Sequence, residues 1–326
     1  MNVLSLFDGM SCGQIALNRI GKKVDNYYAS EVDSYAIQIT QANYPDTIQL
    51  GDVSKVSYKD GVLYTENGEH NVGKIDLMFG GSPCQGFSKA GKKLNFEDPR
   101  SALFFQFVRI LKEVSPTHFM LENVGMKKDH IDVISDQLNV EPIAINSALV
   151  SAQNRPRIFW TNIPGVQLPE DKGIILADIL DKDIKPVKKK LERLKTSYFS
   201  TDGLKEFQTD CVSFTTITRF KENKEPNPVK RWIKKHNETI VIRNHKHGTL
   251  TTSNGYLIKV NHDDYDPNNH FENCTIRKAT IDECEELQTV PIGYTAVDGI
   301  SNTQRQKVLG NGWTVDVIAH ILKNIK

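Results

Sequence analysis

The first half of the chain alternates short runs rich in β-branched and aromatic residues with longer segments of helical periodicity. This rhythm is typical of a parallel sheet covered by helices, because parallel strands need long crossover connections. Helical spacing is clearest where Leu103, Phe107 and Leu111 recur on one face. The predicted class is therefore α/β, with strands at 3–7, 26–30, 48–50, 75–79, 118–121, 142–146 and 157–161, and helices at 13–19, 34–43 and 101–114.

A change of pattern after about residue 186 predicts a second, smaller domain that is rich in loops and short strands. Helical periodicity returns near the end of the chain, where Thr280 and Glu283 have the spacing of a capping box. The predicted domains are 1–185 together with 276–326, and 186–275 between them. Further elements are expected as strands at 212–217, 239–242 and 256–260 and helices at 280–288 and 315–323, the last helix packing beside the first strand.

Bulk composition excludes several classes of protein. The chain has 326 residues, of which 39% are hydrophobic and 25% charged, as in ordinary globular domains. No apolar run reaches the roughly 20 residues of a membrane helix, and the first residues lack a signal-peptide pattern. The five cysteines are scattered and have no CxxC spacing, so neither a disulfide framework nor a metal site is expected. We expect a cytoplasmic protein without a membrane partner, monomeric in solution.

Charge is segregated along the chain, although the formal net charge is only +1. The segment 182–246 holds 17 Lys and Arg against 8 Asp and Glu, whereas the remainder holds 24 against 32. Charge runs often form solvated faces only. Here aromatic residues such as Trp232 and Phe220 lie among the basic ones, which also suits a surface that binds nucleic acid.

Cys84 lies in a glycine-flanked turn, Gly80 to Ser88, directly after the predicted strand 75–79. A thiol that only fills the core would more often lie inside an apolar run, so this position is open to a nucleophile as well as to a structural thiol. Glu122, beside another strand end, offers a carboxyl group that favours the nucleophile.

The loop from Phe7 to Gly13 follows the first predicted strand and opens a helix, a place where free N–H groups face a ligand. Glu31 and Asp52 end the second and third strands, where acids accept hydrogen bonds from ribose hydroxyls. These positions suit an adenosine-containing cofactor, although ordinary strand-to-helix turns are the alternative. NAD is disfavoured because the loop is not the Gly-x-Gly-x-x-Gly fingerprint.

These residues together resemble the DNA cytosine-5 methyltransferases of bacterial and phage type. The resemblance implies a Rossmann-like fold that uses S-adenosylmethionine, with a mixed, mostly parallel sheet and a small target-recognition domain. It covers most of the chain in unbroken order: the Phe7 to Gly13 loop, Glu31, Asp52, Pro83-Cys84-Gln85, Glu122-Asn123-Val124, Gln153 to Arg157, Arg277 to Gln288 and Gly310-Asn311-Gly312.

The chemistry implied by this resemblance begins with addition of the Cys84 thiolate to cytosine C6, which makes C5 a carbon nucleophile. Glu122 is expected to hold or protonate N3, with Arg155 as its partner, and Arg157 to grip O2. C5 then takes the methyl group, and loss of its proton expels Cys84. The cytosine must first leave the duplex, which costs a few kcal/mol of stacking and pairing.

The resemblance also implies a set of binding residues. Asn123 is expected to anchor the Pro83 turn and contact the base. The cofactor is expected at Phe7, Asp8, Gly9, Met10, Ser11, Glu31, Val32, Asp52, Val53, Pro83, Leu103, Asn311 and Trp313. Double-stranded DNA is expected at Gln85, Ser88, Lys89, Lys92, Arg100 and Asn123, with base reading by Arg219, Arg243, Thr249, Thr251 and Asn254.

Two departures from the family pattern bear on these expectations. Trp313 follows Gly310-Asn311-Gly312 where bacterial members commonly have a small residue, and we expect it to stack near the cofactor. The run Gln288-Thr289-Val290-Pro291 replaces the usual Gln-Gly-Phe-Pro at a structural turn. A methyltransferase of RNA and a catalytically silent DNA-binding regulator are the alternatives, and both an orphan enzyme and a restriction-modification partner remain open.

Overall fold

A mixed, mostly parallel sheet of seven strands forms the centre of the computed structural model, which describes residues 1–82, 99–180, 211–214, 243–244, 250, 256–260 and 274–325. The first five strands in the order β3-β2-β1-β7-β8-β10-β9 are parallel, and β10 is antiparallel to both of its neighbours. The strands are β1 (Asn2–Leu6), β2 (Asn26–Ser30), β3 (Ile48–Gln49), β7 (Leu77–Gly80), β8 (His118–Val124), β9 (Pro142–Asn146) and β10 (Pro156–Thr161). The predicted class is confirmed.

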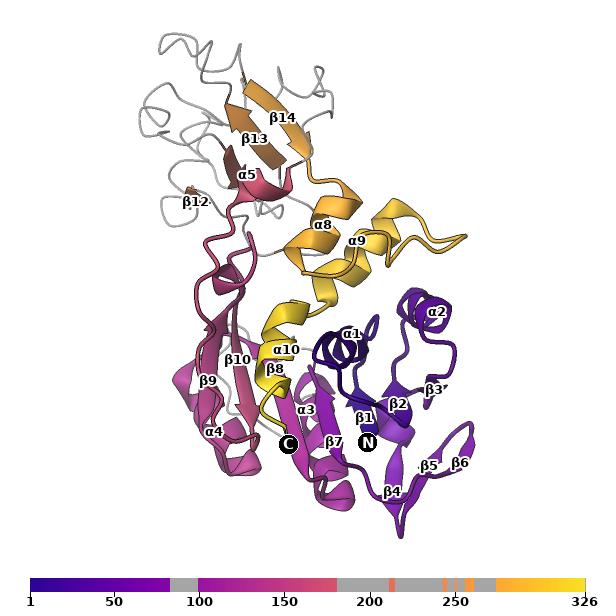
Figure 1. Ribbon diagram of the computed structural model, residues 1–326. Coiled ribbons are helices and arrows are strands. Elements are labelled where there is room, and N and C mark those ends of the chain that lie inside the picture. The colour runs from indigo at the N-terminus through magenta and orange to yellow at the C-terminus, as the bar shows by residue number, and fades with distance from the viewer. Residues whose placement is uncertain are drawn as a thin grey trace, which may run out of the picture.

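Helices cover both faces of this sheet. Leu77 and Phe79 of β7 join one apolar cluster, whereas Met78 between them joins the other, as the alternation of strand side chains requires. The first cluster includes α1 (Cys12–Arg19) and α10 (Val315–Leu322), and the second includes α3 (Pro99–Val114) and α4 (Lys128–Leu138). Figure 1 shows α10 beside α1, so the last helix reaches β1 through the shared cluster that contains Val3.

The first helix can approach the sheet closely because Gly13, its second residue, has no side chain. A Cβ atom at Gly13 would lie 2.3 Å from the Phe79 ring and 2.9 Å from the Tyr27 hydroxyl oxygen. No carbon fits at such a distance. The glycine therefore brings the N-terminus of α1, and the loop before it, directly over the end of β7.

Helix α8 (Ile281–Leu287) begins where the capping box was predicted. The Thr280 hydroxyl accepts a hydrogen bond from the Glu283 N–H at 3.1 Å, and the Glu283 carboxylate accepts one from the Thr280 N–H at 2.8 Å. This prediction is confirmed. The remaining helices along the chain are α2 (Ser34–Asn43), α5 (Leu176–Ile179) and α9 (Asn302–Asn311).

Some elements were not predicted. A small antiparallel sheet of β4 (Ser57–Lys59), β5 (Val62–Thr65) and β6 (Gly68–Asn71) is inserted before β7, and its strands are short and largely exposed. Helix α9 was also missed. It buries only its last turn, around Val308 and Leu309, so it has no apolar stripe along its length that would predict a helix. Helix α4 was likewise missed.

A second, four-stranded antiparallel sheet lies within the basic part of the chain and just after it. Its order is β12-β11-β13-β14, with β11 (Cys211–Phe214), β12 (Arg243–Asn244), β13 (Tyr256–Val260) and β14 (Cys274–Lys278). The strand predicted at 256–260 is confirmed, and the one predicted at 212–217 is confirmed over 212–214, with 215–217 outside the described residues. The strand predicted at 239–242 lies outside the described residues, and the domain boundaries at 185 and 276 remain predictions.

Within the described residues, no helix is both long and apolar enough to cross a membrane.

Candidate active site

The carboxyl ends of parallel strands β1, β2, β7 and β8 meet at one edge of the sheet, and predicted site residues lie at or just after these ends. The loop after β1 reaches Glu31 after β2, because the Gly9 N–H donates to the Glu31 carboxylate at 2.7 Å. Gly81 after β7 lies against Glu122 of β8: a Cβ atom there would be 3.0 Å from Glu122 Oε2. The loop after β1 and Gly81 after β7 thus each lie against one of the predicted site carboxylates.

The loop after β1 has an unusual backbone. Phe7, Gly9 and Ser11 have φ values of 57°, 59° and 58°, in the left-handed region that residues other than glycine rarely adopt. Such strained positions persist only where surrounding contacts hold them, and they concentrate at functional sites. The contacts here come from Asp8, whose carboxylate accepts hydrogen bonds from the Ser11 hydroxyl and, at 2.7 Å, from the Tyr27 hydroxyl.

Glu31 organises the other side of this edge. Its carboxylate accepts the N–H groups of Val32 and Asp33, both at 2.8 Å, in addition to that of Gly9. The neighbouring Val32 side chain is 71% exposed, although it is apolar. Asp52 caps the short helix η1 (Val53–Lys55) by accepting the Ser54 N–H at 2.8 Å. Two carboxylates and an uncovered apolar side chain suit a ribose and its base.

The side chains of several other predicted cofactor residues point away from this edge or only partly reach the surface. Met10 and Val53 are buried in the two apolar clusters, so only their backbone can face a ligand. Leu103 is half-buried at the second cluster, and Asn311 is exposed at the end of α9.

Burial raises the pKa of Asp8 to about 6, although hydrogen bonds from Ser11 and Tyr27 oppose the shift. The folded protein therefore keeps this proton at pH values where the unfolded chain, with its carboxyl group near 3.8, has lost it. The stability that Asp8 contributes is consequently full below about pH 4 and is lost as the pH rises through about 6.

Asp8→Asn is expected to remove this pH dependence. As the pH rises from 5 to 7.5, the wild-type protein should lose unfolding free energy relative to the variant. The reason is that Asp8 must ionise in a buried site, whereas the asparagine forms no charge. Urea unfolding at both pH values measures the difference. A difference that stays constant would contradict the burial of a titrating Asp8.

Glu122 lies inside β8, which runs three residues further than predicted, and its side chain is buried. Arg157 on the antiparallel neighbour β10 forms an ion pair with it, with 2.9 Å between Arg157 Nε and Glu122 Oε1. The indole Nε1 of Trp313 donates to Glu122 Oε2 at 3.1 Å. A cation and a neutral donor thus hold the two oxygens of one carboxylate.

Arg155 is placed differently from the prediction. It is buried and donates to the carbonyl oxygens of Leu250 at 2.8 Å, Gly312 at 2.8 Å and Gly310 at 3.3 Å. Burial, assisted by the charge of Arg157, lowers its pKa to about 9. The predicted pairing with Glu122 is wrong in detail, since Arg157 makes the ion pair and Arg155 acts on Glu122 only through its charge. The reason is local: Arg155 precedes β10, and its side chain points to the carboxyl end of α9.

Asn123 reaches the start of the predicted cysteine turn. Its side-chain nitrogen lies 3.5 Å from both the carbonyl oxygen and the hydroxyl of Ser82. The turn itself lies outside the described residues, as do Pro83, Cys84, Gln85, Ser88, Lys89, Lys92, Arg219, Thr249, Thr251 and Asn254. Arg100 and Arg243 lie in α3 and β12, and only their backbone is described.

Several residues of this edge were missed by sequence reasoning. Tyr27 supports Asp8, and the Tyr294 hydroxyl donates to the Met10 carbonyl oxygen at 2.7 Å. Gln153 accepts the Leu250 N–H at 2.7 Å, so Gln153 and Arg155 together take both backbone groups of Leu250. Tyr294 and Leu250 are brought in by tertiary packing, for which no local pattern exists.

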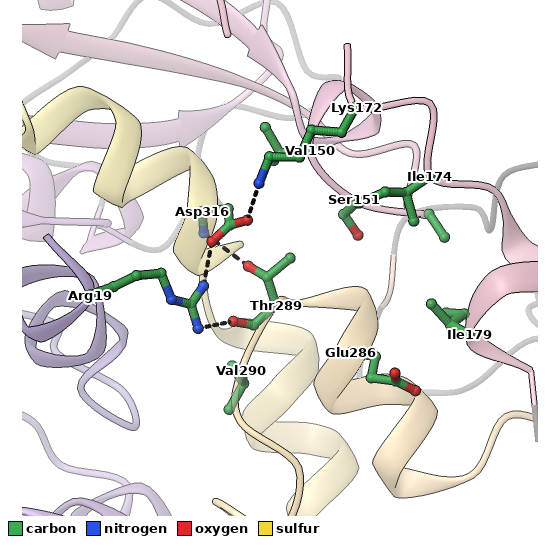
Figure 2. Close-up of a pocket in the computed structure, with 11 residues that line it drawn as sticks. Arg19, Val150, Ser151, Lys172, Ile174, Ile179, Glu286, Thr289, Val290 and Asp316 are labelled. Atoms are coloured by element: carbon green, nitrogen blue, oxygen red, sulfur yellow. Dashed lines mark hydrogen bonds and ion pairs between the residues drawn. The ribbon is translucent and has the colours of Figure 1, made fainter. Parts of the chain in front are cut away.

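A cavity of about 510 Å³ lies between α1, α8 and the start of α10, and the predicted site residues are not among those that line it. Figure 2 shows Arg19 and Lys172 both directed at Asp316, which Lys172 contacts at 2.7 Å. Its basic groups are therefore already paired. Among the described residues, no group of three or more His, Cys, Asp or Glu side chains could hold a metal ion.

The whole chain, residues 1–326, matches a family model described as C-5 cytosine-specific DNA methylase. It is 32% identical over 216 residues to the orphan methyltransferase M.Rho11sI of Bacillus phage rho11s, covering 61% of this chain and 40% of that protein. It is 35% identical over 168 residues to the type II methyltransferase M1.ScrFI of Lactococcus lactis subsp. cremoris, covering 48% and 40%. The matched segments thus span two fifths of these relatives' own length.

Solved structures share the fold. The Entamoeba histolytica methyltransferase EhMeth superposes with a TM-score of 0.66 at 16% identity, covering 100% of this chain and 99% of that one. The S. pombe Dnmt2 methyltransferase gives a TM-score of 0.60 at 16% identity, covering 99% and 97%. At these identities the likeness concerns the fold alone, which is Rossmann-like as predicted.

Proposed function

Because this chain belongs to the C-5 cytosine-specific DNA methylase family, we propose that it methylates C5 of a cytosine in a specific double-stranded DNA sequence. The methyl donor in this proposal is S-adenosylmethionine. The observation that carries it is the buried Glu122 carboxylate, held by Arg157 at the edge of the sheet where the loop after β1 meets Glu31. This reaction needs a carboxylate that can act on the base next to the site that binds the methyl donor.

In this proposal the methyl donor binds at the carboxyl ends of β1, β2 and β3. The backbone around Gly9 faces it, Glu31 and Asp52 accept hydrogen bonds, and the exposed Val32 side chain covers an apolar ring. When bound, S-adenosylmethionine supplies an electrophilic methyl group on a sulfonium centre. Trp313 and Phe79 would close the side of the site toward Glu122.

The chemistry on the base follows from three side chains. The Cys84 thiolate adds to C6 of a flipped cytosine and forms a carbon–sulfur bond, while electron density moves through the ring to C5. Glu122 interacts with N3 and Arg157 with O2, where charge develops as the thiolate adds. After C5 has gained the methyl group, loss of the C5 proton restores the ring and breaks the bond to Cys84.

The segment 186–275 is proposed to recognise the target sequence, and the basic residues 182–246 to contact phosphates. Arg219, Arg243, Thr249, Thr251 and Asn254 are the candidates for reading base edges. Lys89, Lys92 and Arg100 are the candidates for contacts near the flipped base. The antiparallel sheet β12-β11-β13-β14 supports this assignment, since most of its strands come from this segment and none of them joins the central sheet.

Methyl transfer from tritiated S-adenosylmethionine tests the proposal. We expect label in duplex DNA at cytosine C5 and none in transfer RNA, with bisulfite sequencing identifying the target. Label in transfer RNA alone would replace the proposal with RNA methylation. DNA binding without transfer to any sequence would favour a silent regulator.

The affinity for DNA is expected to depend steeply on salt. Each phosphate neutralised by a Lys or Arg should lower log K by about 0.9 per unit of log salt concentration, because condensed counterions are released on binding. Fluorescence anisotropy with a labelled duplex at several salt concentrations measures the slope. Replacing Lys188, Lys189 and Lys190 with Gln should flatten it if these residues contact phosphates, and a flat wild-type dependence would refute the role of the basic segment.

A further inference from the structure

Trp313 was expected to stack near the cofactor, but its indole N–H also donates a hydrogen bond to the Glu122 carboxylate. The bond from Trp313 Nε1 to Glu122 Oε2 is 3.1 Å long and joins segments 191 residues apart in sequence. The other oxygen of the same carboxylate lies 2.9 Å from Arg157 Nε. Both oxygens are therefore engaged by separate parts of the fold.

The indole ring is fixed on several sides. It meets the Phe79 ring edge-on, with centroids 5.7 Å apart and planes at 73°. Gly81 leaves room for it, since a Cβ atom there would lie 2.9 Å from Trp313 Nε1. The preceding residue, Gly312, packs near the start of α1, since a Cβ atom there would lie 3.3 Å from the Cys12 sulfur. The ring is thus held against Phe79 and Gly81 at the carboxyl end of β7.

The residues that flank Trp313 are anchored as well. The Gly312 carbonyl oxygen accepts hydrogen bonds from Arg155 at 2.8 Å and from Gln288 at 3.2 Å. The Thr314 hydroxyl is bonded to Ser147 and Gln288 at 2.8 Å and 2.9 Å. A donor mounted so firmly has little freedom to follow the carboxylate, so the carboxylate must align with the donor.

The terminal torsion of a glutamate is soft, because rotation between the carboxylate and the preceding carbon has broad minima. A single contact from Arg157 leaves the plane of the carboxylate free to turn, whereas a second donor on the other oxygen fixes it. Each carboxylate oxygen has two lone-pair directions, so both can be held while one still faces a base.

We propose that Trp313 is a positioning residue: its indole N–H orients the Glu122 carboxylate toward the ring edge of the target cytosine. This inference deepens the proposed function and rests on it. It differs from cofactor stacking, for which the ring alone would suffice and the N–H would be dispensable.

Trp313→Phe separates the two roles, because it keeps an aromatic ring against Phe79 and removes the donor. Incorporation of benzothienylalanine at position 313 is the closer match, since sulfur replaces N–H in a ring of the same shape. For both variants we expect the single-turnover rate of methyl transfer at saturating S-adenosylmethionine to fall about tenfold. The dissociation constant for S-adenosylmethionine, measured by calorimetry, should change less than twofold.

The opposite pattern would overturn the inference. A cofactor dissociation constant raised tenfold or more with an unchanged saturating rate would assign Trp313 to the cofactor. An unchanged rate and an unchanged dissociation constant would also overturn it, since the N–H would then have no role.

The contact itself can be tested without turnover. The chain has three tryptophans, so the indole N–H signals of ¹⁵N-labelled protein are few, and Trp313→Phe assigns the relevant one. Glu122→Gln should shift this signal, because a charge-assisted hydrogen bond becomes a neutral one. Glu113→Gln, in the more exposed Glu–Arg pair of α3, should leave it in place.

An indole signal that does not respond to Glu122→Gln would show that the Trp313–Glu122 hydrogen bond is absent, and would overturn the positioning role. Failure of the proposed function is distinguishable from this result. A wild-type protein that transfers no methyl group would still show the shift if the Trp313–Glu122 bond exists.

Discussion

Glu122→Gln is expected to lower the rate of methyl transfer by about 10²–10⁴-fold, the range that a positioned acid or base contributes. The amide keeps the size of the side chain but cannot carry the negative charge that Arg157 and Trp313 hold in place. It can neither exchange a proton with N3 nor accept two donors in the same geometry. Single-turnover kinetics at saturating DNA and S-adenosylmethionine measure the loss.

Glu113→Gln is the matched control for this loss. Glu113 also pairs with an arginine, at 2.7 Å from Arg109, and it accepts the Tyr58 N–H on the other face of the molecule's central sheet. Its replacement should leave the rate within about twofold and the affinity for DNA unchanged. An equal loss of the methyl-transfer rate in the two variants would show that Glu122 affects stability rather than the chemistry.

Glu285→Ala is expected to lower the free energy of unfolding by about 3–5 kcal/mol, the usual effect of removing one member of a buried ion pair. The Glu285 side chain is fully buried and lies 3.3 Å from the Arg305 guanidinium. It also accepts the N–H groups of Gly293 at 2.6 Å and Thr295 at 2.8 Å. Its loss leaves several buried donors without their acceptor. Urea unfolding followed by circular dichroism measures the change.

The neighbouring Glu286 provides the control on the same helix. Partial burial raises its pKa, and the charges of Glu283 and Asp282 add to the shift, so its ionised form is disfavoured where it lies. Glu286→Ala should therefore change the free energy of unfolding by less than about 1 kcal/mol. A Glu285→Ala variant as stable as Glu286→Ala would contradict the role of Glu285 as the anchor of the loop after α8.

Much of the fold was predictable from the sequence because local patterns and tertiary structure agree there. The strands at 26–30 and 142–146 have the predicted bounds, and the capping box of Thr280 and Glu283 forms both of its hydrogen bonds. Short apolar runs between helical segments leave a chain few options other than a covered parallel sheet. The small, largely polar sheet β4-β5-β6 carries no such pattern and was missed.

Sequence patterns could propose site residues but not their contacts. Motif order predicted Glu122 and Arg157, and a departure from the motif drew attention to Trp313, but neither could reveal which side chain holds which. Arg155 and Arg157 are two residues apart, and only the structure separates the one that pairs with Glu122 from the one that binds backbone carbonyls. Contacts such as Trp313 with Glu122 depend on how the C-terminal segment packs on the sheet, which no local spacing encodes.

The most direct measurement of the proposed mechanism is covalent trapping on duplex DNA that contains 5-fluorocytosine in its target sequence. Fluorine cannot leave C5 as a proton does, so the bond between Cys84 and C6 should persist after methyl transfer. We predict a protein–DNA complex that survives denaturation, requires S-adenosylmethionine and is absent with Cys84→Ser. A methylated product without such a complex, or a complex that persists in Cys84→Ser, would contradict the account.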